Sequence, residues 1–177
     1  MGSPKALLDF HGECFLDRLT RLFAACCAPV VVVLGHEPEA IRRGLRHPER
    51  ACFVVNPDYR LGQLTSMQCG LRAVPPEADG VLFTLVDHPN VRGSTLERLI
   101  EHRNAPVAIP TFQGRRGHPV FFHRDLTAEL LALPPDSQAR VVVRRHASPA
   151  SYVEVDDPGV LDDIDDAAAY RRLIGVP

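Results

Sequence analysis

The sequence predicts an α/β fold in which a mainly parallel sheet lies between layers of helices. Two apolar runs with little alternation, residues 30–34 and 81–86, support this prediction, because strands of a parallel sheet are covered on both faces. The third observation is the order of the chain, in which strand patterns alternate with helical ones. No repeat, low-complexity segment or linker interrupts the 177 residues, so residues 1–177 are expected to form a single domain.

Local signals define the elements of the first half. Pro29 and Gly35 bound a run of β-branched residues, and Pro38 suits the first turn of a helix. Thr65 or Ser66 is the predicted N-cap of a later helix. After a loop at the N-terminus, the elements expected in order are a helix at 13–28, a strand at 30–34, a helix at 38–46, a strand at 52–55 and a helix at 66–71.

The second half begins with the central strand and ends in an acidic tail. Tyr152 to Val155 alternates between polar and apolar residues, as an edge or antiparallel strand does, and Asp166 is positioned to cap a final helix. The elements expected in order are a strand at 81–86, a helix capped by Ser94, two strands at 107–109 and 120–122 joined by a glycine turn, helices at 124–133 and 137–146, and a strand at 152–155.

Composition excludes several classes of protein. The formal net charge of -2 gives no electrostatic reason to expect a nucleic acid or an anionic membrane as partner. No apolar run approaches the ~20 residues of a membrane span, and no charged-then-apolar leader opens the chain, so a cytoplasmic location is expected. The five cysteines are odd in number and have no C-x-x-C spacing, which favours free thiols in a reducing compartment over zinc ligands or disulfides.

Lys5 and Asp87 are the first candidates for chemistry. Lys5 is the only lysine among 20 basic residues, which favours a site that needs a compact charge on a flexible stem, although chance is the alternative. Asp87 follows the central strand and precedes Pro89, at the carboxyl end where open α/β sheets bind ligands. It is interpreted either as a ligand of Mg²⁺ shared with phosphate oxygens or as a cap of the next helix.

Asp163 and Asp165 are the next candidates. They occupy alternate positions of an extended segment, so both carboxylates lie on one side while Ile164 faces the core. The pair is either half of a metal site or part of a solvated acidic loop.

Seven stretches together resemble the MobA-like nucleotidyltransferases, most nearly the branch of molybdenum cofactor cytidylyltransferases. They occur in the family's order and cover nearly the whole chain. The stretches are Met1-Gly2-Ser3-Pro4-Lys5-Ala6-Leu7-Leu8, Val31-Val32-Val33-Leu34-Gly35-His36, Asn56-Pro57-Asp58-Tyr59, residues 62–71 (GQLTSMQCGL), Leu85-Val86-Asp87-His88-Pro89, residues 114–120 (GRRGHPV) and Asp163-Ile164-Asp165.

The resemblance implies a Rossmann-like three-layer sandwich of the nucleotide-diphospho-sugar transferase type. It implies Mg²⁺-dependent transfer of CMP or GMP from a nucleoside triphosphate, with CTP favoured, to the terminal phosphate of molybdopterin, and release of pyrophosphate. A recipient molybdoenzyme is a further expected partner. Two alternatives stay open: transfer to a sugar or polyol phosphate, and a non-catalytic carrier of the pterin cofactor. A Rossmann dehydrogenase is disfavoured, because no G-x-G-x-x-G follows a strand.

The same resemblance implies the roles of individual residues, all of which handle charge or position a ligand. Lys5 neutralises triphosphate oxygens, Asp87 binds the metal and acts with Lys5 in catalysis, Asp163 or Asp165 completes the metal shell, Thr65 and Ser66 contact the nucleotide, and Gly117, His118 and Pro119 lie on the acceptor side.

One departure from the family pattern stands at the start of the chain. Family members have a strand and a glycine-rich loop of the type Leu-Ala-Ala-Gly-x-Ser-x-Arg directly before Met-Gly-x-x-Lys, whereas this sequence begins at that methionine. Without the strand we expect a gap with exposed ladder edges in the sheet, an edge that recruits a second copy into a homodimer, and little or no transferase activity. A mis-assigned start, trimming and a natural fragment are the competing explanations.

Overall fold

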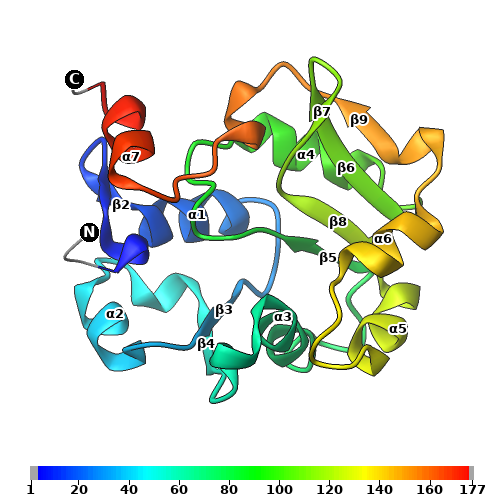
Figure 1. The fold of residues 1–177 in the computed structure, drawn as a ribbon, viewed down its shortest axis with the longest axis horizontal. Coiled ribbons are helices and arrows are strands. Elements are labelled where there is room, and N and C mark those ends of the chain that lie inside the picture. Colours follow the sequence, from blue (N-terminus) through cyan, green and yellow to red (C-terminus); the bar gives the residue numbers. More distant parts are fainter. Residues whose placement is uncertain (1–3, 176–177) are drawn as a thin grey trace.

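The helices and strands follow the predicted α/β order (Figure 1). The computed structural model describes residues 4–175, so the first three residues of the predicted N-terminal loop lie outside the described part. The α-helices are α1 Phe15–Ala24, α2 Pro38–Gly44, α3 Gln63–Leu71, α4 Gly93–Glu101, α5 Thr127–Ala132, α6 Arg140–His146 and α7 Ala167–Leu173. The strands are β1 Asp9–Phe10, β2 Glu13–Cys14, β3 Val31–Leu34, β4 Cys52–Val55, β5 Gly80–Phe83, β6 Val107–Phe112, β7 Arg115–Arg116, β8 Val120–His123 and β9 Tyr152–Glu154.

The larger sheet has the strand order β5-β8-β6-β7, and β9 pairs with β6 as well. β8 is antiparallel to both β5 and β6, while β9 is parallel to β6. The pairings are therefore mixed, because the glycine-turned connection at Gly114 brings β8 back beside β6. Of the two alternatives predicted for residues 152–155, the edge strand is correct and the antiparallel one is not, because among the described residues β9 pairs with β6 alone and does so in parallel.

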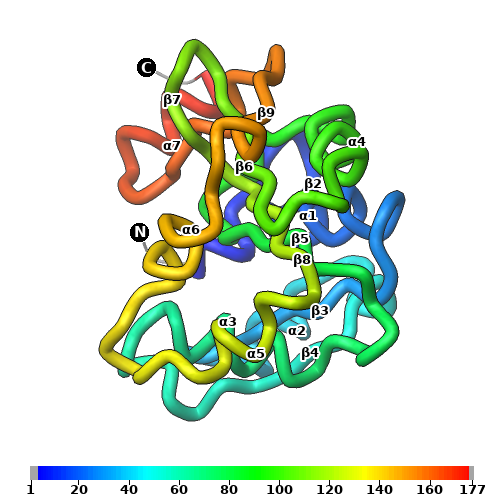
Figure 2. The backbone as a smooth tube through the Cα atoms, turned by 90° about the vertical axis from the view of Figure 1, so that its right-hand side faces the viewer, coloured from blue at the N-terminus to red at the C-terminus, as the bar shows by residue number. Residues whose placement is uncertain are grey.

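Side chains alternate across this sheet and build two cores. Val120 and Phe122 of β8 face one core, whereas Phe121 between them faces the other, as the period of two requires. The first core includes residues of α3, α5 and α6, and the second includes residues of α1 and α4. Figure 2 shows the backbone from the side, with α4 and α6 on opposite sides of β6. The predicted three-layer sandwich is confirmed.

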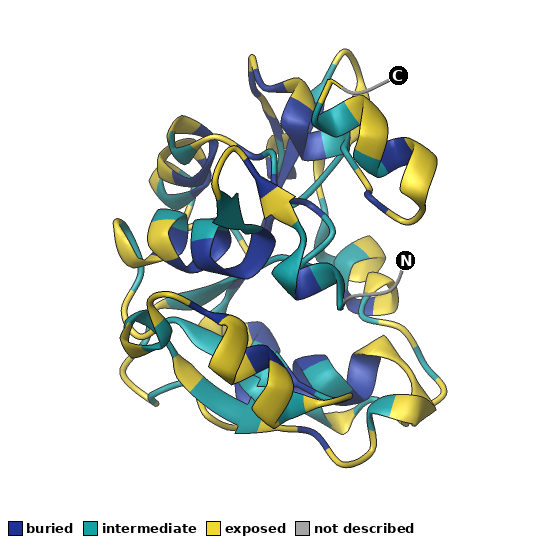
Figure 3. Ribbon diagram, turned by 90° about the vertical axis from the view of Figure 1, so that its left-hand side faces the viewer, coloured by how far each residue is buried: buried dark blue, intermediate teal, exposed yellow. Residues whose placement is uncertain are grey.

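The strands β3 and β4 form a separate, parallel two-stranded sheet. Among the described residues, the second edge of β3 and the second edge of β5 have no strand partner. A cavity of about 1140 Å³ lies between them and is lined by residues 30–34 and 80–86. The gap expected in the sheet is therefore present, and it explains why β3 and β5 are mostly half-buried rather than buried, the class of residue coloured teal in Figure 3.

Two predicted boundaries are wrong at this gap. The central strand ends at Phe83 instead of Val86, because a strand needs a neighbour to extend its ladder and β8 is the only strand in the described part of the chain that pairs with β5. The helix α3 begins at Gln63 with Gly62 as its N-cap, so neither Thr65 nor Ser66 caps it. The Thr65 hydroxyl instead lies 2.8 Å from the Gly62 carbonyl oxygen, inside the first turn.

The final helix begins as predicted. The Asp166 carboxylate accepts a 2.7 Å hydrogen bond from the Ala169 backbone N–H and caps α7. None of the helices within residues 4–175 is both long and apolar enough to cross a membrane.

Candidate nucleotide and metal site

Lys5 is brought to the acidic candidates by the short helical turn Lys5–Leu7. Its Nζ donates a 2.6 Å hydrogen bond to Asp165 Oδ1 and lies 3.9 Å from Asp87 Oδ2. Ala6 anchors the turn, because it is buried in the core formed with Leu16 and Ile41. The only lysine of the chain therefore stands between two of the carboxylates predicted to act with it.

Asp87 lies in a turn that two contacts tie to the acidic segment 162–165. The Ile164 backbone N–H donates a 3.0 Å hydrogen bond to the Asp87 carbonyl oxygen. Three residues further on, the Asn90 amide donates a 2.7 Å hydrogen bond to Asp162. Ile164 itself is buried, as predicted, so the carboxylates on either side of it point away from the core. The backbone thus fixes the distance between Asp87 and Asp163.

Burial raises the pKa of Asp87 above its usual range, and the negative charge of Asp163 adds to that shift. His88 and Lys5 act in the opposite direction without cancelling it. Asp87 Oδ1 is buried and accepts no hydrogen bond from any residue within 4–175. A buried carboxylate oxygen without a partner is costly, and a bound cation removes that cost.

Asp87, His88 and Asp163 each offer a ligand atom, and these atoms lie within 4.8 Å of one another. Carboxylate oxygens are the ligands that Mg²⁺ and Mn²⁺ prefer, and an imidazole nitrogen is accepted more readily by a first-row transition metal such as Mn²⁺ than by Mg²⁺. The orphaned Asp87 Oδ1 and this donor set fit a divalent cation. Asp165, the third predicted ligand, is not in the group, because its carboxylate pairs with Lys5.

Thr65 and Ser66 lie in the first turn of α3, where Asn56 holds both. The Asn56 amide donates 3.0 Å hydrogen bonds to the two hydroxyl oxygens. Thr65 is buried, and its hydroxyl is engaged inside the loop. Ser66 lines the cavity together with Lys5, so it is the member of the pair that faces the open space.

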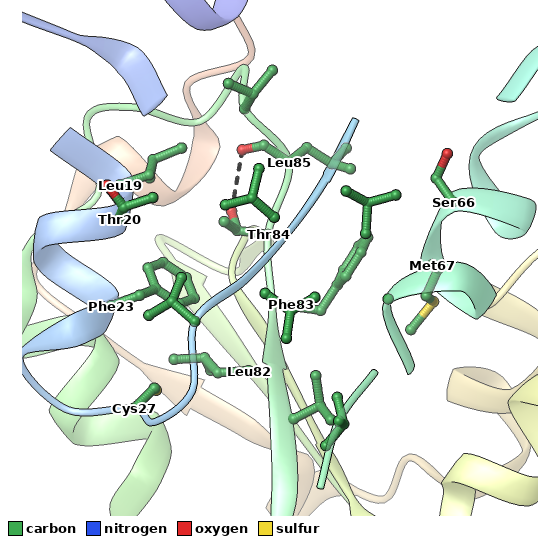
Figure 4. Close-up of a pocket in the computed structure, with 18 of the residues that line it drawn as sticks. Leu19, Thr20, Phe23, Cys27, Ser66, Met67, Leu82, Phe83, Thr84 and Leu85 are labelled. Atoms are coloured by element: carbon green, nitrogen blue, oxygen red, sulfur yellow. Dashed lines mark hydrogen bonds between the residues drawn. The ribbon is translucent and has the colours of Figure 1, made fainter. Parts of the chain in front are cut away.

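Figure 4 is a close-up of the residues that line the cavity, with α1 on one side and α3 on the other. The side chains labelled there come from α1, from α3 and from the central strand with its following turn: Leu19, Thr20, Phe23 and Cys27; Ser66 and Met67; and Leu82, Phe83, Thr84 and Leu85. Val86 also lines the cavity and directly precedes Asp87. The acidic cluster, which consists of Asp87, Asp163 and Asp165, therefore lies at the margin of the cavity.

His118 is the one member of the predicted acceptor stretch that meets the acidic cluster. Its ring centroid is 4.6 Å from that of His88. Burial lowers the pKa of His118 to about 4, and the charge of a protonated His88 acts in the same direction. Its imidazole is therefore neutral at pH 7.

Gly117 and Pro119 have packing roles. A Cβ on Gly117 would lie 2.2 Å from the Val160 carbonyl oxygen, so only glycine fits this approach. Pro119 is buried. These two residues shape the backbone around His118.

Sequence reasoning missed His88 as a member of the cluster. Its signal was present, because an imidazole directly follows the predicted ligand Asp87 and precedes a proline that stops the chain. His88 is buried, and its Nδ1 has no hydrogen-bond partner within the described residues.

A lysine and several carboxylates at the end of a sheet, beside a cavity, are the features of α/β proteins that bind phosphorylated ligands with a cation. The chain belongs to the MobA-like NTP transferase family, whose model matches residues 1–150. It is thus a member of a nucleotidyltransferase family, and such enzymes generally use divalent metals.

Three similar proteins illustrate the range of the family. The molybdenum cofactor cytidylyltransferase of Escherichia coli is 23% identical over 93% of this chain and 84% of its own length. A 2-C-methyl-D-erythritol 4-phosphate cytidylyltransferase of Streptomyces avermitilis is 33% identical over 62% of this chain, but the match spans only 46% of that protein. The crystal structure of Rv0371c from Mycobacterium tuberculosis in complex with manganese is 28% identical, with a TM-score of 0.85 over 98% of this chain and 93% of its own.

Proposed function

We propose that this chain transfers a nucleotidyl group, CMP in preference to GMP, from a nucleoside triphosphate to the terminal phosphate of a molybdopterin-type acceptor. The observation that carries the proposal is the position of Lys5 Nζ, 3.9 Å from the carboxylate of Asp87. A point charge beside a carboxylate that can hold Mg²⁺ is what a triphosphate and its metal ion require. The similarity to the E. coli cytidylyltransferase supports cytosine and the pterin acceptor.

The reaction needs no general base. An acceptor phosphate oxygen, already anionic at pH 7, attacks the α-phosphorus, a P–O bond forms, and the bond from the α-phosphorus to the bridging oxygen breaks with release of pyrophosphate. A divalent cation bound at Asp87 and Asp163 supplies charge neutralisation for the triphosphate. The side chains of this chain then have two tasks, which are neutralisation by Lys5 and in-line positioning of both substrates.

The remaining predicted residues divide between binding and support. Ser66 faces the cavity and is proposed to contact the nucleotide, while Thr65 holds the loop that presents it. His118 is proposed to lie on the acceptor side, with Gly117 and Pro119 fixing its backbone. Asp165 is proposed to orient Lys5 until phosphate oxygens replace its carboxylate.

Transfer to a sugar or polyol phosphate is the second candidate. This candidate is supported by the 33% identity to a cytidylyltransferase that is named for a phosphorylated polyol, although the match covers only 62% of this chain. The non-catalytic carrier, the recipient molybdoenzyme and self-association through the open strand edges stay predictions. A cytoplasmic location is part of the proposal, since all five cysteines are free thiols.

Pyrophosphate release tests the proposal. CTP and GTP are compared with Mg²⁺ or Mn²⁺, and molybdopterin is compared with a sugar phosphate and a polyol phosphate. The assay is run on this chain and on a chain extended upstream in the same reading frame. We expect release with CTP and molybdopterin from the extended chain and little or none from this chain, and Lys5→Met should lower the release about 10²–10³-fold in the active form. Release with a polyol phosphate alone would favour the second candidate, and pterin binding without release from either chain would favour a carrier.

A further inference from the structure

His88 is buried beside the acidic cluster in a position that core packing alone leaves unexplained. Its side chain is 8% exposed, and Nδ1 has no hydrogen-bond partner among the described residues. Nε2 lies 3.8 Å from Asp87 Oδ1, which is itself buried and has no hydrogen-bond partner within residues 4–175. Nε2 is therefore the ring nitrogen that faces an orphaned carboxylate oxygen, at a distance that a cation bound between them would span.

We propose that His88 is a nitrogen ligand of the divalent cation held by Asp87 and Asp163, and that this ligand makes the site prefer Mn²⁺ to Mg²⁺. The inference rests on the proposed function only in taking this cluster as the cation site of the transferase. It adds a ligand that neither the sequence motifs nor the family resemblance indicated.

The geometry is close to that of a coordination shell. Ligand atoms at about 2.0–2.2 Å from a metal ion lie at most about 4.4 Å from one another. One atom from each of the three side chains already falls within 4.8 Å of the others. Small side-chain rotations therefore close the shell, with the remaining positions left for phosphate oxygens or water.

The backbone around His88 leaves the ring little freedom. The His88 N–H donates a 3.3 Å hydrogen bond to the Leu85 carbonyl oxygen, and the next residue, Pro89, is fully buried. The His118 ring lies against the His88 ring at 4.6 Å with an interplanar angle of 34°. An imidazole held in this way is preorganised for one metal position.

The donor set decides the choice of metal. Mg²⁺ is a hard cation that takes oxygen ligands almost exclusively, whereas imidazole nitrogen suits transition metals. A site of two carboxylates and one imidazole thus favours Mn²⁺ over Mg²⁺. Two carboxylates without the imidazole would show no such preference.

Binding of Mn²⁺ and Mg²⁺ to the purified chain, measured without nucleotide, tests the inference. His88→Gln removes the ring nitrogen and keeps a polar side chain. His102→Gln is the control, because it replaces a half-buried histidine at the C-cap of α4, whose Nδ1 lies 2.9 Å from the Arg98 carbonyl oxygen and outside the ligand group. We expect His88→Gln to raise the Kd for Mn²⁺ about 10- to 100-fold and the Kd for Mg²⁺ by less than about 3-fold. Equal effects on both metals would overturn the preference.

Pulsed EPR of bound Mn²⁺ reads the ligand directly. A ¹⁴N modulation in the parent protein that His88→Gln abolishes and His102→Gln retains supports the proposal. Bound Mn²⁺ without a ¹⁴N coupling in the parent would overturn it, and this measurement stands even if the variant does not fold. Nitrogen coupling without any pyrophosphate release would contradict the proposed function alone, whereas release without nitrogen coupling would contradict this inference alone.

Discussion

The backbone N–H of Ile164 donates a 3.0 Å hydrogen bond to the carbonyl oxygen of Asp87, although 76 residues separate the two in the sequence. This bond joins the turn after β5 to the acidic segment before α7. Ile164 is also buried, with only 4% of its surface exposed, and it packs with Phe10 and Phe15. The same residue therefore sets both how closely the acidic segment 162–165 lies against the core and its register relative to Asp87. The spacing of Asp87 and Asp163 therefore depends on a residue that has no polar side chain.

Ile164→Ala is expected to weaken the fold and the cation site together. Loss of the buried side chain costs about 2–5 kcal/mol, and Asp163 loses its fixed position. Urea denaturation and Mn²⁺ titration measure the two effects. Val141→Ala, at a valine that is 42% exposed, is the control and should change the free energy of unfolding by less than about 0.5 kcal/mol. Unchanged Mn²⁺ affinity in Ile164→Ala would show that the segment keeps its register without this anchor.

Asp163→Asn and Asp165→Asn are expected to differ sharply. Asp163 belongs to the ligand group, so its loss should weaken Mn²⁺ binding about 10-fold or more. Asp165 is 72% exposed and pairs with Lys5, and exposed pairs contribute little, so Asp165→Asn should leave Mn²⁺ binding nearly unchanged. Titration of both variants at one ionic strength checks this. The reverse order of effects would restore the predicted ligand role of Asp165.

Asp87→Asn is expected to stabilise the protein in EDTA at pH 7. Between the ordinary pKa of an aspartate and the raised pKa of folded Asp87, the native state binds more protons than the unfolded state. The free energy of unfolding therefore falls as pH rises through that window, and the variant avoids this loss. Thermal melts should show a higher Tm for the variant in EDTA, and no further rise on adding Mn²⁺.

The control for that experiment is Asp156→Asn, at an exposed carboxylate outside the ligand group. It should keep the Tm of the parent in EDTA and the full rise with Mn²⁺. A lower Tm for Asp87→Asn than for the parent in EDTA would contradict the argument.

His118 predicts a loss of stability in mild acid. Its pKa is lowered from 6.5 to about 4 in the folded state, so the unfolded state binds more protons between these values. Stability from this group is complete above pH 6.5 and falls as pH drops toward 4, by about 3 kcal/mol at most. His118→Gln should flatten the pH dependence of urea midpoints between pH 4.5 and 6.5 in EDTA, whereas His102→Gln should not. An unchanged slope in His118→Gln would assign the acid sensitivity to other groups.

Gly117→Ala separates packing from acceptor binding. The added Cβ would meet the Val160 carbonyl oxygen at 2.2 Å, so the backbone must shift, at a cost of about 1–3 kcal/mol. Gly93→Ala is the matched control, because its nearest neighbour lies at 3.9 Å. Urea midpoints compare the two. A stable Gly117→Ala that no longer binds the acceptor would return Gly117 to the direct role that the sequence predicted.

The layers and most elements could be predicted, because they depend on local patterns. β-branched runs and proline or glycine boundaries located β3 and β4, and a helix-capping aspartate located the start of α7 at Asp166. The position of Ile164 in the core followed from alternation alone. Such features need no knowledge of the distant chain.

The misassigned features depend on distant partners. The end of β5 at Phe83 depends on how far β8 runs beside it. The alternation in residues 152–155 also left the direction of β9 open, because that direction depends on the path of the chain after α6. The division of labour between Asp163 and Asp165 depends on where Lys5 arrives from the other end of the chain. His88 was missed because the ring that lies against it, that of His118, is 30 residues away in sequence.

The open edges of β3 and β5 have a consequence for the exchange of amide hydrogens with solvent. In β5 every second backbone N–H points toward β8 and is protected, while the N–H groups between them point into the cavity. Exchange along residues 80–83 should therefore alternate between slow and fast, within a strand that lies in the middle of the molecule. An extended segment that paired with this edge would slow the fast set alone, so the exchange pattern reports whether the cavity holds a strand.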